Sequence, residues 1–121
     1  MSQKLYSILL ILILFSCGKD LPKLEGMDLD KWKNDKNACL GDRKEMEAAL
    51  QTEKTKLKGL SEMDIIKLLG KPDGNELSER NQKFYMYYIN ASPACSLADS
   101  SARKLILRFN AMGYAQLTSI E

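Results

Sequence analysis

The sequence has 121 residues and not one histidine among them. Without an imidazole there is no Ser-His-Asp or Cys-His catalytic site, no HExxH zinc site and no histidine general base. A charge excess is missing too, because 18 basic and 16 acidic side chains leave a net charge of only +2. Nucleic-acid-binding proteins normally show a strong basic excess, so we expect no nucleic-acid partner for this chain.

Catalytic and metal-binding motifs are equally scarce. The sequence has no glycine-rich phosphate loop, and none of its carboxylates stands in a recognisable catalytic pair. Asp28, Asp30 and Asp35 have part of the spacing of a calcium loop. However, Trp32 takes a ligand position and the glycine turn is missing. We therefore predict a protein that is not an enzyme and that has no cofactor and no metal site.

Only one long hydrophobic run is present. It extends without a break from Ile8 to Phe15, follows Lys4 and ends at Ser16. A transmembrane helix needs roughly 20 apolar residues, so this run is too short for a permanent span. A basic residue, a short apolar core and a small residue are typical of a secretory signal peptide, which we place at residues 1–16.

The end of this run carries a more specific pattern. It is Leu14-Phe15-Ser16-Cys17, which resembles the lipobox of bacterial lipoproteins, where a small residue precedes a cysteine that is lipidated and becomes the mature N-terminus. The resemblance implies that Cys17 is a lipidation site; the alternative is a buried cysteine behind an ordinary signal peptide. By the same resemblance, Gly18 is compatible with the outer membrane. We expect a lipid-anchored protein of the bacterial cell envelope that faces the periplasm, with exposure at the cell surface as the alternative.

Two cysteines remain if Cys17 carries lipid. In the oxidising envelope we expect Cys39 and Cys95 to form a disulfide. Such a bond closes a long loop, and its restriction of the unfolded chain is worth roughly 4 kcal/mol. Two buried thiols, or two thiols too far apart to be joined, are the alternatives.

The mature chain is long enough for one domain with a modest core. Its first part, residues 17–26, is short and polar and contains Pro22, as is typical of a tether between a lipid and a domain. The remainder, residues 27–121, is expected to form a single domain. An apolar fraction of 45% fits a folded chain.

Helical patterns come first in this domain. Residues 28–36 are expected to form one helix and residues 42–57 a second, which carries its apolar side chains on one face. The best-defined helix follows a cap at Ser61, which has an acidic residue three positions later, and it stops at Gly70. Residues 72–75 (Pro-Asp-Gly-Asn) then predict a turn.

Strand patterns follow the helices. Side chains alternate with a period of two over residues 84–89, 105–109 and 114–120, and residues 110–113 predict a hairpin turn between the last two strands. Helices followed by strands favour the α+β class. We expect N-terminal helices packed on one face of a three-stranded antiparallel sheet.

The order of these elements resembles a known family. The segment from Gly59 to Asp73, which contains Leu-Gly-Lys-Pro, looks like the helix-to-turn segment of the SmpA/OmlA (BamE) domain. Tyr85–Tyr88 and Leu105–Tyr114 are similar to the strands of that domain. The resemblance, over residues 59–120, implies an ααβββ fold and an accessory, non-catalytic role in the assembly of outer-membrane β-barrels. The architecture also resembles the repeat unit of β-lactamase-inhibitor proteins, which bind other proteins through a sheet face.

Aromatic side chains make up only 7% of the chain, and they supply the candidate binding residues. Tyr85 and Tyr87 are candidates for a partner-binding surface, because exposed aromatic side chains anchor protein interfaces. Trp32 is a further candidate, and for all three the alternative is a place in the core or under a loop. We thus expect a module that binds another envelope protein. A structural or stress-related lipoprotein, or an inhibitor-like binder, is the alternative.

Overall fold

The computed structural model describes residues 20–78, 82–95 and 102–121. The predicted signal peptide and the predicted lipidation site Cys17 lie outside these residues. The helical segments come first: α2 (Leu29–Asn34), the 3-10 turn η2 (Lys36–Ala38), α3 (Asp42–Glu45), α4 (Glu47–Glu53), the 3-10 turn η3 (Lys54–Leu57) and α5 (Glu62–Leu69). The strands follow: β1 (Gly74–Leu77), β2 (Lys83–Tyr88), β3 (Lys104–Phe109) and β4 (Ala115–Ile120).

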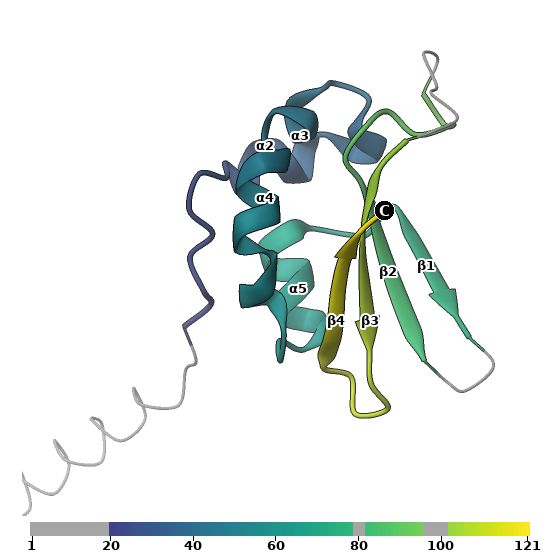
Figure 1. Ribbon diagram of the computed structural model, residues 1–121. Helices are drawn as coiled ribbons and strands as arrows, with labels where there is room; N and C mark the ends of the chain where they lie inside the picture. Colours follow the sequence, from purple (N-terminus) through teal and green to yellow (C-terminus); the bar gives the residue numbers. More distant parts are fainter. Residues whose placement is uncertain (1–19, 79–81, 96–101) are drawn as a thin grey trace, which may run out of the picture.

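The fold belongs to the predicted α+β class, and its short helices gather on one face of the sheet (Figure 1). The helices and the sheet share one hydrophobic core. In β2 and β3 every second side chain faces the helices and is buried, as the alternating pattern predicts. The buried side chains of these two strands are Tyr85, Tyr87, Leu105, Leu107 and Phe109. They form one cluster with the helical side chains Trp32, Leu50, Leu57, Ile65 and Leu69.

The sheet has four strands in the order β1-β2-β3-β4, and every neighbouring pair is antiparallel. The prediction of three strands is therefore wrong, because Gly74 and Asn75, expected in a turn, begin β1. Pairing with β2 overrides the turn preference of these residue types. A Cβ at Gly74 would lie 2.5 Å from Cε of Met86, the flexible end of that side chain, which would have to move aside.

The helix predicted over residues 42–57 is divided into α3, α4 and η3. The first break is at Met46, whose N–H donates to the carbonyl of Arg43 at 3.0 Å, three residues back instead of four. Met46, Leu50 and Leu57 are nevertheless all buried. A spacing of three or four residues fits both α and 3-10 turns, so the apolar pattern predicted the buried face but not the breaks.

Helix α5 matches the helix expected between Ser61 and Gly70. Oγ of Ser61 accepts a hydrogen bond from the N–H of Asp64 at 3.2 Å, which is the predicted cap. Gly70 ends the helix with a φ of +80°, a backbone conformation that glycine adopts without strain. The buried side chains of α5 are Ile65, Leu68 and Leu69.

The N-terminal segment is packed against the domain from about Leu21 onward, although residues 17–26 were predicted to be a tether. Leu24 is only 3% exposed and belongs to the core cluster. The N–H of Glu25 donates to Oε1 of Glu53 in α4 at 3.1 Å, and this segment runs beside α4 in Figure 1. The buried Leu24 and the partly buried Leu21 therefore pack as part of the domain, which composition alone does not reveal.

A buried ion pair connects the helices to the sheet. Nη1 of Arg43 donates to Oδ2 of Asp73 at 2.6 Å, and both side chains are almost fully buried. The guanidinium also donates to the carbonyls of Trp32 at 2.9 Å and Tyr88 at 3.1 Å. The Asp73 carboxylate accepts from the N–H groups of Tyr88 at 2.8 Å and Asn37 at 3.0 Å. Segments from α2, α3, β2 and the turn before β1 therefore meet at one pair of charges.

A second buried carboxylate, that of Asp35, organises the turn after α2. It accepts hydrogen bonds from the N–H groups of Leu40 at 2.7 Å and Arg43 at 2.9 Å. Between Asp35 and Leu40, the residues Asn37 and Ala38 have φ angles of 58° and 57°, a region that residues with a side chain seldom adopt. The hydrogen bonds to Asp35 thus hold a turn that is unfavourable by itself.

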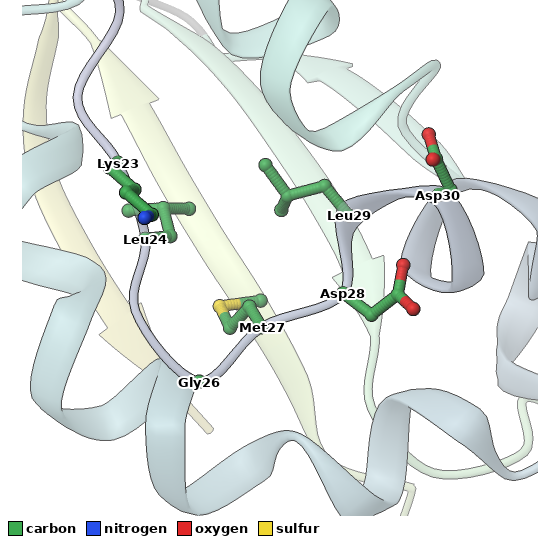
Figure 2. A pocket seen from close by; sticks show the side chains of 7 residues that line it. All are labelled: Lys23, Leu24, Gly26, Met27, Asp28, Leu29 and Asp30. Atoms are coloured by element: carbon green, nitrogen blue, oxygen red, sulfur yellow. The ribbon is translucent and has the colours of Figure 1, made fainter.

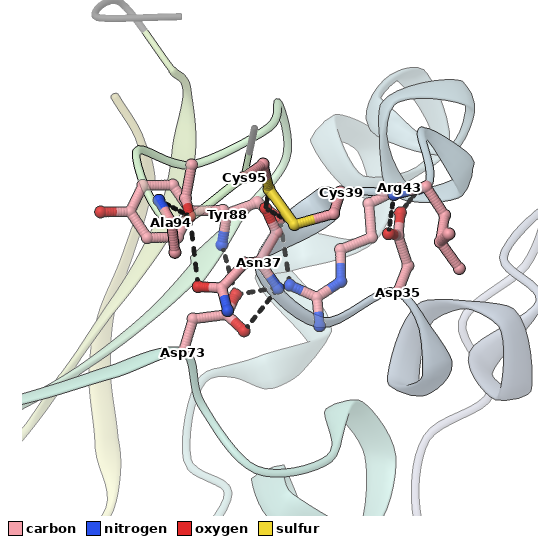
Figure 3. The surroundings of a disulfide bond; sticks show 10 residues. Asp35, Asn37, Cys39, Arg43, Asp73, Tyr88, Ala94 and Cys95 are labelled. Atoms are coloured by element: carbon pink, nitrogen blue, oxygen red, sulfur yellow. Dashed lines mark hydrogen bonds and ion pairs between the residues drawn. A yellow bond between two sulfur atoms is a disulfide. The ribbon is translucent and has the colours of Figure 1, made fainter. Parts of the chain in front are cut away.

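The predicted disulfide is confirmed between Cys39 and Cys95, with 5.5 Å between the two Cα atoms. Figure 3 shows that it lies beside the Arg43–Asp73 pair. The N–H of Ser92 donates to the carbonyl of Asn37 at 3.0 Å, which joins the same two segments a second time. The disulfide therefore fastens the loop after β2 to the turn after α2.

Replacing Asp73 with asparagine is expected to destabilise the protein strongly, because it leaves the buried charge of Arg43 without its counter-ion. We expect a loss of about 3–5 kcal/mol in the free energy of unfolding, measured by urea denaturation. Arg103→Met is the matched control. It breaks a pair with Glu47 in which the arginine is 46% exposed, and it should cost less than about 1 kcal/mol. Equal losses in the two variants would contradict a special role for Asp73.

Candidate functional site

The aromatic side chains predicted as partner-binding anchors are in the core. Trp32 and Tyr87 are fully buried, and Tyr85 is 5% exposed. The hydroxyl of Tyr87 donates to the carbonyl of Gly70 at 2.8 Å, and the ring of Tyr85 lies 4.7 Å from that of Phe109. The expectation that these three residues form an exposed surface is therefore corrected. A period of two shows that a strand has two faces, but it does not show which one the helices cover.

The other side chains of β2 and β3 lie on the uncovered side of the sheet. We call this surface the open face and define it by Phe84, Met86, Ile106, Arg108 and Leu117. Phe84 is paired with Arg108, and Arg108 with Leu117, so these three form a row across β2, β3 and β4. Met86 and Ile106 are paired in the next row. Each side chain of the open face is at least partly exposed.

An irregularity in the register of β4 helps to build the open face. The pairing of β3 with β4 shifts between Arg108, which faces Leu117, and Phe109, which faces Ala115. Gln116 is the additional residue, as in a β-bulge. Ala115 is therefore buried on the helix side, while Leu117, two residues later, is 48% exposed on the other side.

The open face is hollowed and mixed in chemistry. The side chains of β2, β3 and β4 enclose a depression of about 330 Å³. Its floor is apolar, because Phe84, Met86, Ile106 and Leu117 all line it. Its rim is charged and carries both signs, from Glu76, Lys104, Arg108 and Glu121. An apolar centre with a polar rim is the usual anatomy of a protein-binding surface.

A hydrogen-bonded trio lies on the helix side of the sheet, where α5 meets the start of β2. The hydroxyl of Tyr85 donates to Oε1 of Glu62 at 2.8 Å, and Nζ of Lys83 lies 2.8 Å from the same oxygen. Burial, followed by the hydrogen bond and the charge of Glu62, raises the pKa of Tyr85 to about 12. The hydrogen bond from Lys83 is the main cause that lowers the pKa of Glu62. At neutral pH the phenol stays protonated and serves as a donor that fixes α5 on the sheet.

A second hollow, larger than that of the open face, belongs to the N-terminal segment. Figure 2 shows it inside the bend from Lys23 to Asp30, with a volume of about 560 Å³. Its carboxylates, from Asp28 and Asp30, lie on the side opposite to Lys23 (Figure 2). Asp28 is also engaged, because its Oδ1 accepts from the N–H of Lys31 at 3.2 Å and caps α2. These charged groups do not converge on one point, so the hollow is not a candidate for chemistry.

Within the ranges that the structure covers, no three side chains of histidine, cysteine, aspartate or glutamate are grouped so that they could hold a metal ion. The buried ion pair of Arg43 and Asp73, beside the disulfide, is not a candidate binding site, because each group neutralises the charge of the other. Arg43 and Asp73 make all their close contacts within the protein. The open face is therefore the surface with the best claim to a binding function.

Replacing Glu62 with glutamine is expected to lower the pKa of Tyr85 from about 12 toward 10. The titration of Tyr85 alone is obtained by subtracting the 295 nm absorbance of Tyr85→Phe from that of the parent protein. Because the folded-state pKa is raised, the stability from this phenol is complete below about pH 10 and is lost as the pH rises to about 12. A folded protein in which Tyr85 ionises near pH 10 would refute the proposed environment.

No helix in the described part of the chain is both long and apolar enough to cross a bilayer. Comparisons with protein-family models, with curated proteins and with solved structures give no match to this chain. Any functional assignment therefore depends on the residues themselves.

Proposed function

We propose that this protein is a lipid-anchored, non-catalytic module of the bacterial cell envelope that binds another protein through the open face. The observation that carries the proposal is the apolar hollow of the open face. Four apolar side chains line it, and no helix of residues 20–78, 82–95 or 102–121 covers it. Contiguous apolar surface that remains exposed in a folded domain is typical of protein interaction sites.

Two features of the fold suit this function. The charge network and the disulfide fasten the helical side of the domain, so the sheet is a rigid platform for the side chains of the open face. The open face is also built on strands, which position side chains more precisely than loops do. A preorganised surface loses little conformational entropy when a partner binds.

An accessory role in the assembly of outer-membrane β-barrels is the specific form of this proposal. It is supported by the resemblance of residues 59–120 to the SmpA/OmlA (BamE) domain. That segment contains α5, the turn at Pro72 and the four strands β1 to β4. The strand β1 between the turn and β2 is a departure from the expected ααβββ order.

The open face is tested by replacing two of its apolar side chains with residues that favour strands. Phe84→Thr combined with Leu117→Thr should abolish the capture of a partner from native membranes by cross-linking and affinity purification of the full-length protein. The matched control combines Leu40→Thr and Met112→Thr, which change exposed apolar side chains outside the open face. A partner that is recovered equally with both double variants would refute binding through the open face.

The identity of the captured protein separates the two levels of the proposal. Subunits of the β-barrel assembly machinery, recovered by the parent and by the control but not by the open-face variant, would support the accessory role. A different envelope complex with the same dependence would retain the binding function and reject that role.

The lipid anchor is tested at Cys17. We expect Cys17→Ala to release the protein from membranes, because the thiol that receives the lipid is absent. Fractionation measures the release, and the mass of the mature N-terminal peptide of the parent protein should include the lipid. Unchanged membrane retention of Cys17→Ala, together with a parent peptide that carries no lipid, would contradict the lipobox interpretation.

A further inference from the structure

One cation of the open face has no counterpart in the described chain. We infer that the open face receives a protein segment with a carboxylate that pairs with Arg108 and with neighbouring apolar side chains that fill the hollow. This inference rests on the proposed binding function and adds the chemistry of the partner to it.

A comparison among the arginines of the described ranges points to Arg108. Arg43 and Arg103 each have a carboxylate oxygen at 2.6 Å, from Asp73 and Glu47. Arg108 forms no ion pair with any described residue. Its Nε is buried, and no described group forms a hydrogen bond with it. The side chain as a whole is partly exposed, so a carboxylate from a partner can approach the guanidinium and supply the counter-ion that the described residues do not.

The neighbours of Arg108 define the shape of the partner. Phe84 and Leu117 flank it in the same row across the sheet, and Ile106 lies two residues before it on β3. The planar guanidinium can bind a carboxylate with two parallel hydrogen bonds. The apolar side chains on both sides would exclude water from this pair and strengthen it. A carboxylate next to large apolar side chains is therefore complementary to this part of the open face.

The acidic groups on the rim of the hollow, Glu76 and Glu121, are not the pairing partners of Arg108. Glu76 on β1 is paired with Phe84 on β2, so the strand β2 lies between Glu76 and Arg108. Glu121 is paired with Lys104, with backbone hydrogen bonds of 2.8 and 3.0 Å, at the other end of the hollow. These two carboxylates would repel a polyanion such as a nucleic acid. Lys104 also forms no ion pair with a described residue, but it lies at the far end of the hollow beside Glu121. Arg108, which lies between Phe84 and Leu117, instead fits an isolated carboxylate of a protein.

The experiment selects peptides from a random twelve-residue phage-displayed library on the full-length protein purified in detergent. We expect the enriched peptides to contain aspartate or glutamate next to aromatic or aliphatic residues. The strongest peptide is then synthesised with its carboxylate intact and with the carboxylate replaced by the amide. Calorimetry should show at least tenfold weaker binding for the amide peptide on the parent protein.

The variant Arg108→Met identifies the protein group that binds the carboxylate. It preserves much of the aliphatic stem and should bind the acidic peptide at least tenfold more weakly, with no further loss for the amide peptide. Arg103→Met, whose arginine pairs with α4, is the matched control and should bind like the parent protein. Circular dichroism of each variant verifies that the domain is folded.

The possible failures are distinguishable. Peptides that bind Arg108→Met as tightly as the parent protein, but do not bind the Phe84→Thr and Leu117→Thr variant, would overturn the carboxylate inference and retain the proposed function. If the peptides bind all of these variants as tightly as the parent protein, or if no peptide is enriched, both the carboxylate inference and the proposed binding function are overturned.

Discussion

The junction of the helices and the sheet depends on the ion pair between Arg43 and Asp73. Removing both charges from water is expensive, and a buried pair is tolerated only when its remaining donors and acceptors are also satisfied. Here the guanidinium reaches two backbone carbonyls, and the carboxylate accepts from two backbone N–H groups as well. The pair also holds the residue that leads into β1, because Asp73 directly precedes Gly74. This contact therefore anchors the entrance to the edge strand, whose position is set by its pairing with β2.

Local chemistry made part of the fold predictable. The cap at Ser61, the stop at Gly70 and the period of two in β2 and β3 each depend on neighbouring residues, and the structure contains all of them. The disulfide was predictable because the assignment of Cys17 to the lipid leaves one pair of cysteines, Cys39 and Cys95. The strand β1 was not, because it depends on long-range pairing between turn-favouring residues and β2. Tertiary pairing decided against local preference there.

The candidate site was less predictable than the fold. The aromatic strand was correctly placed, but the alternation left two faces to choose from, and the tyrosines at 85 and 87 face the helices. The side chains of this strand on the open face are those that alternate with the two tyrosines, Phe84 and Met86. The importance of Arg43 and Asp35 was also hidden, because a buried charged residue looks the same in a sequence as an exposed one.

The irregularity in β4 has a consequence for comparing this chain with others. Because Gln116 is the residue left over between two paired positions, a chain without it could retain Ala115 on the buried side and Leu117 on the exposed side. An alignment gap of one residue would then be neutral at this position. A gap at Thr118 instead would reverse the faces of the strand on one side of it. Insertions and deletions in β4 should therefore be tolerated only at the bulge, so the spacing of this strand carries more structural information than the identity of its polar residues.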